Sequence, residues 1–117
     1  MPRANPKAEP VPEHFTKDML DVIKAGLGLH YKRVPYKNRL DFNIGREGIV
    51  TAAQCEGWGL LVQDYAEHYG KMRVFRVTGA GFQAAGILRP KADLLALATR
   101  AAESHPDASA PALPLTA

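Results

Sequence analysis

Basic side chains cluster in residues 30–39, and binding an anionic partner is the chemistry that these residue types allow. The cations alternate with tyrosines, and the stretch contains no acidic residue; its cations are Lys32, Arg33, Lys37 and Arg39. Lysine and arginine neutralise phosphates, and aromatic rings stack on bases, so this stretch is a candidate nucleic-acid contact. The alternative is a solvated face whose tyrosines pack inward.

A second set of cations lies within six residues further along the chain. Its members are Lys71, Arg73 and Arg76. We expect these residues on a β-hairpin, where they could follow a DNA backbone or a minor groove. Charged residues on a hairpin edge also prevent pairing with other strands, and that structural role fits the same pattern equally well.

Three aromatic residues are candidates for contact with a protein partner: Trp58, Tyr65 and Tyr69. Tyrosine and tryptophan are enriched in protein interfaces, and both tyrosines fall in a polar segment that offers little core. A tryptophan at a helix end is more often a core residue, so burial is the alternative for Trp58.

Catalytic and metal-binding patterns are missing from the sequence. The four histidines, at positions 14, 30, 68 and 105, are scattered, and Ser104 and Ser109 are the only serines. Gly79-Ala80-Gly81 lacks the Gly-Lys-Ser/Thr ending of a phosphate loop. Cys55 is the only cysteine, which fits a small buried hydrophobic residue in a reducing compartment. We therefore expect no metal, no cofactor and no enzymatic activity.

Length and composition indicate one small domain. The chain has 117 residues, 46% of them hydrophobic, and a net charge of +3. No apolar run approaches the roughly 20 residues of a membrane helix, and no signal peptide is recognisable. We expect a cytoplasmic protein with a disordered Pro-rich arm at 1–12, a folded domain at 13–103 and a disordered tail at 104–117.

Local signals predict the first elements of the folded domain. Thr16 is a typical N-cap for a helix over 16–26. Thr51 and Gln54 have the spacing of a capping box that would start a short helix at 51–58. The segment 29–48 fits either a short helix or an irregular turn.

The second half of the domain is predicted to contain a hairpin and two helices. Strands at 60–62 and 72–77 are joined by a polar loop, and side chains of the second strand alternate between two faces. Thr78 is expected to cap the next helix, and a last helix is predicted at 91–103. The order predicts an α+β fold like a winged helix-turn-helix, with helices and a two-stranded β-hairpin wing.

Short motifs carry a resemblance to known families. Gly59-Leu60-Leu61-Val62, a charged loop and Val74 to Gly81, with its Thr-x-x-Gly element, resemble the wing of bacterial winged-helix regulators. Together with Gly28-Leu29 and Pro35-Tyr36-Lys37-Asn38, they also resemble small uncharacterised proteins of bacteriophages and prophages. The likeness covers about residues 20–88. It implies a phage-encoded protein of winged-helix type that acts in the host cell cytoplasm.

One departure from the regulators is that the predicted helix 51–58 contains no lysine or arginine. Base reading in the major groove relies on Arg, Lys, Asn and Gln. Two functions therefore remain open. The first is a regulator that binds double-stranded DNA through the wing and the basic loop, with a homodimer through its first and last helices as one assembly. The second is a non-enzymatic inhibitor of a host protein complex, such as a CRISPR-type defence complex or a polymerase. A structural component of a phage particle is a third, less specific option.

Overall fold

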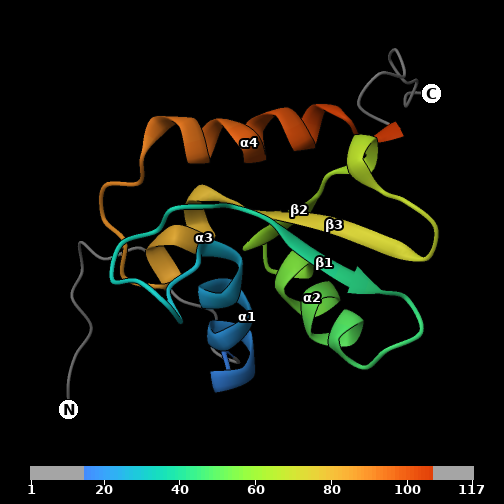
Figure 1. Ribbon diagram of the computed structural model, residues 1–117, viewed down its shortest axis with the longest axis horizontal. Coiled ribbons are helices and arrows are strands. Elements are labelled where there is room, and N and C mark those ends of the chain that lie inside the picture. Colours follow the sequence, from blue (N-terminus) through green and yellow to red (C-terminus); the bar gives the residue numbers. More distant parts are fainter. Residues whose placement is uncertain (1–14, 107–117) are drawn as a thin grey trace.

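A three-stranded antiparallel sheet lies between two layers of helices in the computed structural model, which describes residues 15–106 (Figure 1). The strands are β1 (Leu40–Asn43), β2 (Leu61–Gln63) and β3 (Met72–Val77), and β3 is central. One face is covered by α1 (Lys17–Leu27), α2 (Gly48–Gly57) and α3 (Gly79–Ala84), and the other by α4 (Ala92–Glu103). A 3-10 turn, η1 (Tyr65–Glu67), lies between β2 and β3.

Helix α1 begins at the predicted cap and ends at Leu27, one residue past the predicted end. The hydroxyl of Thr16 accepts a hydrogen bond from the backbone N–H of Met19 at 3.1 Å, which confirms the N-cap. Gly28 ends the helix in the left-handed conformation with φ of 81°. Ile23 and Leu27 are fully buried on the face that meets the sheet and α2.

Strand β1 was not predicted, and it changes the sheet from two strands to three. Leu40 pairs with Phe75, and Asn43 pairs with Met72, in an antiparallel ladder. The predicted hairpin of β2 and β3 is confirmed, with Leu61 opposite Val77. Segment 40–43 lacks a distinctive strand pattern, and its extended conformation is stabilised by pairing with β3, some 30 residues later in the chain.

Helix α2 begins at Gly48, so the predicted capping box at Thr51 is wrong. Thr51 lies inside the helix, and Glu47 at the N-cap position makes no side-chain capping bond. Ile49 packs against the core, which favours the earlier start. Cys55 is fully buried, as the sequence predicted for a small hydrophobic residue.

Both faces of β3 are buried. Phe75 and Val77 belong to the core beneath α1, α2 and α3. Val74 and Arg76 alternate with them, as predicted, but α4 covers that face and leaves Val74 with no exposed surface. Neither face of the central strand is therefore an open surface.

The junction between β3 and α3 brings two distant motifs into contact. Thr78 accepts a hydrogen bond from the N–H of Gly81 at 3.1 Å, which confirms it as the cap of α3, and donates one to the carbonyl of Gly59. A methyl group at Gly81 would overlap the carbonyl oxygen of Leu60, so only glycine allows this approach.

The folded part continues past the predicted boundary at residue 103. The hydroxyl of Ser104 accepts a hydrogen bond from the N–H of Tyr65 at 2.9 Å, and the ring of His105 lies 4.9 Å from the ring of Tyr65. These contacts connect the end of α4 to the loop between β2 and β3. The predicted arm at 1–12 and the tail from 107 onward lie outside the described residues.

Candidate functional site

Three of the predicted basic residues lie together on the exposed loop between α1 and β1: Lys32, Arg33 and Lys37. The N–H of Tyr36 donates to the carbonyl of Leu27, and the ring of Tyr36 packs over Gly28. The ammonium of Lys32 lies 5.6 Å from the centre of the Tyr36 ring, within cation–π range. These contacts hold the loop against the end of α1.

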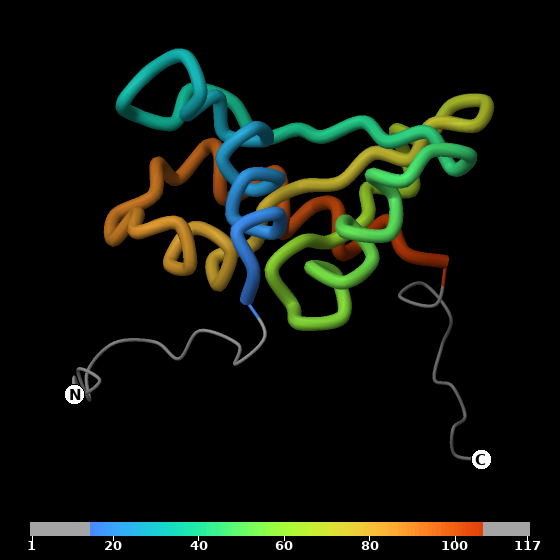
Figure 2. The backbone as a smooth tube through the Cα atoms, turned by 90° about the horizontal axis from the view of Figure 1, so that it is seen from below, coloured from blue at the N-terminus to red at the C-terminus, as the bar shows by residue number. Residues whose placement is uncertain are grey.

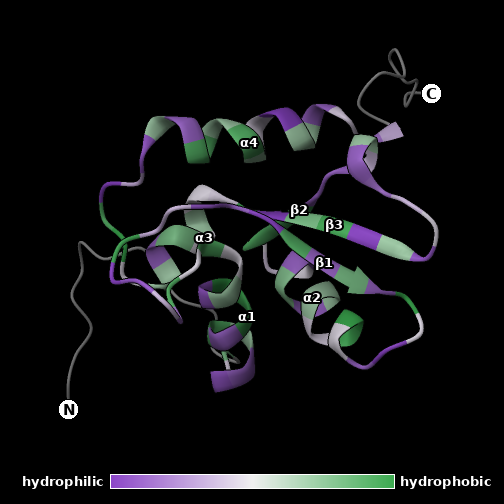
Figure 3. Cartoon of the chain, in the orientation of Figure 1, coloured by the Kyte–Doolittle hydropathy of each residue, from purple (hydrophilic) through white to green (hydrophobic). Residues whose placement is uncertain are grey.

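The segment between α3 and α4 contributes two further cations that the sequence pattern did not single out, Arg89 and Lys91. This segment lies at the same end of the molecule as the loop between α1 and β1 (Figure 1). Along the segment between α3 and α4, hydrophobic residues come first and hydrophilic residues follow (Figure 3). The two segments line an open pocket of about 500 Å³. It is lined by Arg33, Val34, Pro35, Gly86, Ile87, Leu88, Arg89, Pro90 and Lys91.

We call the five exposed cations Lys32, Arg33, Lys37, Arg89 and Lys91 the basic end. Residues 28–38 and 85–92 contain no carboxylate. Within residues 15–106, none of the five side chains forms an ion pair. The structure therefore brings together an unpaired group of positive charges from two segments about 50 residues apart.

Arg39 belongs to a different group of side chains. Its Nε lies 2.8 Å from Oδ1 of Asp41, and its Nη1 lies 3.6 Å from Oε1 of Glu67. The hydroxyl of Tyr69 donates to Oδ2 of Asp41 at 2.7 Å. The hydrogen bond from Arg39 lowers the pKa of Asp41, and the bond to Asp41 raises the pKa of Tyr69. The positive charge of Arg39 is thus already paired with the carboxylates of Asp41 and Glu67.

The turn before β3, with Lys71, and the first residues of β3, with Arg73, are at the opposite end of the molecule from the loop between α1 and β1 (Figures 1 and 2). Lys71 is exposed at the turn, and Nη1 of Arg73 donates to the carbonyls of Gly70 and Met72 at 3.1 Å. The two predicted basic sets therefore do not form one continuous surface.

Arg76, predicted as a wing cation, is buried. Its Nε donates to Oδ2 of Asp64 at 2.9 Å, and its Nη1 donates to the carbonyl of Asn38 at 2.8 Å. The side chain lies on the sheet face that α4 covers, with both partners also buried. The prediction placed Arg76 on an open hairpin, and packing of α4 excludes it from a phosphate contact.

The predicted partner-binding aromatics differ in exposure. Tyr69 is 51% exposed and Trp58, at the end of α2, is 47% exposed, so the core position that is more usual for a tryptophan at a helix end is wrong for Trp58. Tyr65 is half-buried, with its ring 4.9 Å from the ring of His68 as well as from that of His105.

Two large apolar side chains are exposed at the start of α2 and just before it. Val50 is 58% exposed, and Ile44 in the preceding turn is 47% exposed. Like the helix predicted from the sequence, Gly48–Gly57 contains no lysine or arginine. Helix α2 therefore has no cation that could contact a base or a phosphate.

Both ring nitrogens of His68 are hydrogen-bonded. Its Nδ1 accepts a hydrogen bond from the N–H of Val74 at 3.0 Å, so Nε2 carries the proton and faces Oε1 of Gln63 at 2.9 Å. Burial, and then the charge of Arg73, lower its pKa. The imidazole is therefore a neutral structural link between the loop and β3.

The described residues hold no group of three or more His, Cys, Asp or Glu side chains that could bind a metal ion. Burial raises the pKa of Cys55 to about 11, which leaves the thiol protonated and a poor nucleophile.

No helix between residues 15 and 106 has the length and apolarity needed to cross a membrane.

The first and last helices, through which a homodimer was expected, lie on opposite faces of the sheet. One symmetric contact between two copies would therefore have to reach around the sheet to use both helices.

No protein-family model, curated protein or solved structure matches this chain.

Proposed function

We propose that this chain is a non-enzymatic, winged-helix-like protein that binds double-stranded DNA through its basic end. The observation that carries the proposal is the group of five exposed cations without a paired carboxylate. Such a group attracts phosphates and releases counterions from the DNA, which is the main source of affinity in sequence-independent binding.

The arrangement of α2, β2, β3 and α3 supports the winged-helix part of the proposal. In the regulators that the sequence resembles, a recognition helix ends at Gly-Leu and the second wing strand leads into Thr-x-x-Gly and a helix. Here Gly59 accepts a hydrogen bond from Thr78, and Gly81 packs on Leu60. Phage origin stays a prediction from the same short motifs.

The proposed mode of contact differs from that of a helix-turn-helix regulator. A helix-turn-helix joins its two helices by a turn of 3–4 residues, whereas residues 28–47, including β1, separate α1 from α2. With no cation on α2, contact to phosphates is favoured over base reading. We therefore expect binding with little dependence on DNA sequence.

The test is fluorescence anisotropy of a labelled duplex over a range of salt concentrations. Each phosphate contact adds about 0.9 to the slope of log affinity against log salt, so five contacts predict a slope of roughly −4.5 at most. In the double variant Lys32→Gln/Lys37→Gln, we expect the slope to become shallower by about 2.

The matched control is Lys17→Gln/Lys71→Gln, which removes two exposed positive charges outside the basic end. We expect its salt slope to stay close to that of the unmodified chain. Absence of duplex binding at low salt, or equal losses in the two double variants, would contradict the proposal.

Two exposed apolar side chains, at the start of α2 and just before it, support a second candidate, an inhibitor that binds a host protein complex. Val50 in the cation-free helix and Ile44 in the turn before it are large and exposed, which suits a protein better than DNA. This function predicts a stoichiometric complex with a host protein that Val50→Glu disrupts without changing duplex binding. Loss of duplex binding in the same variant, or no complex in any host, would count against it.

A further inference from the structure

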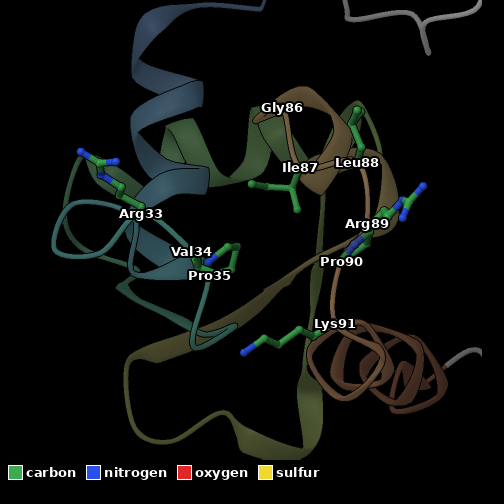
Figure 4. Close-up of a pocket in the computed structure, with 9 residues that line it drawn as sticks. All are labelled: Arg33, Val34, Pro35, Gly86, Ile87, Leu88, Arg89, Pro90 and Lys91. Carbon is green, nitrogen blue, oxygen red and sulfur yellow. The ribbon is translucent and has the colours of Figure 1, made fainter.

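The pocket beside the basic end has the size and lining of a small-molecule site. Its volume of about 500 Å³ lies within the roughly 300–1,000 Å³ that is usual for such sites. The segments that form it, 33–35 and 86–91, are about 50 residues apart in the sequence and lie at the same end of the molecule. Figure 4 shows the apolar residues of both segments around the space between them.

The lining is aliphatic. Val34, Pro35, Ile87, Leu88 and Pro90 provide its apolar surface, and no aromatic side chain takes part. Sites for unstacked bases are built on aromatic rings, so the lining does not favour a nucleobase. An unbranched hydrocarbon chain needs no aromatic partner, because burial against any apolar surface stabilises its binding.

The charge at the pocket is positive. Lys91 extends into the space between the two segments toward Pro35, whereas the ends of Arg33 and Arg89 point outward on either side (Figure 4). None of the lining residues is acidic, and within the described chain none of the three cations forms an ion pair. Lys91 is therefore placed to meet the anionic end of a ligand that enters the pocket.

We propose that this pocket binds a small amphipathic anion with an aliphatic body and a terminal carboxylate. The hydrocarbon chain lies against Leu88 and the other aliphatic residues, and the carboxylate lies beside Lys91. This site goes beyond DNA binding, and the ligand and DNA would compete because Lys91 also belongs to the basic end.

The test uses the full chain without nucleic acid and follows backbone amide resonances during titration with sodium octanoate. We expect saturable shifts centred on residues 33–35 and 86–91. Affinity should rise by up to about fourfold per methylene from butanoate to octanoate, since each buried methylene adds apolar contact. Neutral octanol and acetate should each bind more weakly than octanoate.

Two variants separate the charge from the apolar surface. We expect Lys91→Gln to weaken octanoate binding by about fivefold, whereas Lys37→Gln, with the same loss of charge on the basic end but outside the pocket, should keep it within about twofold. Leu88 is 80% exposed, so Leu88→Gln should weaken binding while the melting temperature stays unchanged.

The inference fails if octanoate produces no saturable shifts up to about 10 mM, a concentration that would reveal even millimolar affinity. It also fails if the shifts centre on another surface, or if Lys91→Gln and Lys37→Gln weaken binding equally. A failure of duplex binding alone would overturn the proposed DNA contact and leave the octanoate result unaffected.

Discussion

The side chain of Asn38 is hydrogen-bonded to both backbone groups of Val77. Its Oδ1 accepts from the N–H of Val77 at 2.6 Å, and its Nδ2 donates to the carbonyl of Val77 at 3.0 Å. The same Nδ2 donates to the carbonyl of Leu94 at 2.9 Å. One buried amide thus joins the loop before β1, the end of β3 and the first turn of α4.

Replacing Asn38 by Ala should destabilise the fold, because one buried N–H and two buried carbonyls would lose their partner. We expect a loss of about 3 kcal/mol in the free energy of unfolding, measured with urea. Asn43→Ala is the control, since the bond that Oδ1 of Asn43 accepts from the N–H of Gly45 is exposed, and this variant should cost less than about 1 kcal/mol. Similar losses for the two variants would contradict the role given to Asn38.

The ion pair between Asp64 and Arg76 should be costly to break from one side. Asp64→Ala leaves the buried guanidinium without its carboxylate, and we expect a loss of about 3 kcal/mol in a urea titration. The double variant Asp64→Leu/Arg76→Met should be less destabilised, because it leaves no unpaired buried charge.

The comparison pair is Arg39 and Asp41, whose side chains are 39% and 27% exposed. Solvent screens such a pair, so Asp41→Ala should cost about 1 kcal/mol or less. If Asp64→Ala were no more destabilising than Asp41→Ala, the buried pair would contribute nothing beyond a surface pair.

Stability should depend on pH through His68. Its pKa is lowered in the folded chain by burial and by Arg73, so the unfolded chain binds the proton more readily. The stability that His68 contributes is complete above its ordinary pKa of 6.5. It is lost as the pH falls through the lowered pKa of His68 in the folded chain. We expect the free energy of unfolding to fall between pH 7.5 and pH 5.5, by at most about 1.4 kcal/mol per pH unit.

The variant His68→Gln removes the titrating group and should flatten this pH dependence, at the cost of some stability at pH 7.5. Unfolding curves at a series of pH values for both chains provide the measurement. An unchanged slope in the variant would assign the titration to another group.

Two glycines should respond to alanine in opposite directions. A Cβ at Gly81 would meet the backbone of Leu60, so Gly81→Ala should lower the melting temperature markedly. Gly57 is helical, and a Cβ there meets nothing within 4 Å, so Gly57→Ala should stabilise by about 0.5–1 kcal/mol. Thermal unfolding of both variants checks the pair, and destabilisation by both would contradict the packing at Gly57.

Local signals correctly predicted the caps of α1 and α3 and the strand pattern of β3. Thr16 and Thr78 cap the helices that follow them, and the alternation of residues 72–77 matches β3. The helix start at Thr51 was wrong because a capping box can form only if the preceding residues are not helical. Contacts of Ile49 with the core extend the helix to Gly48 instead.

The sequence by itself determined the ends of α1, the hairpin of β2 and β3, and the absence of cations on α2, since these depend on residue types and short spacings. Only the tertiary structure decided that β1 pairs with β3, that α4 buries Arg76 beside Asp64, and that Arg89 and Lys91 join Lys32, Arg33 and Lys37. These relationships join segments separated by 12 to more than 50 residues. No local pattern encodes them, because they arise when burial of apolar surface packs distant elements on the two faces of one sheet.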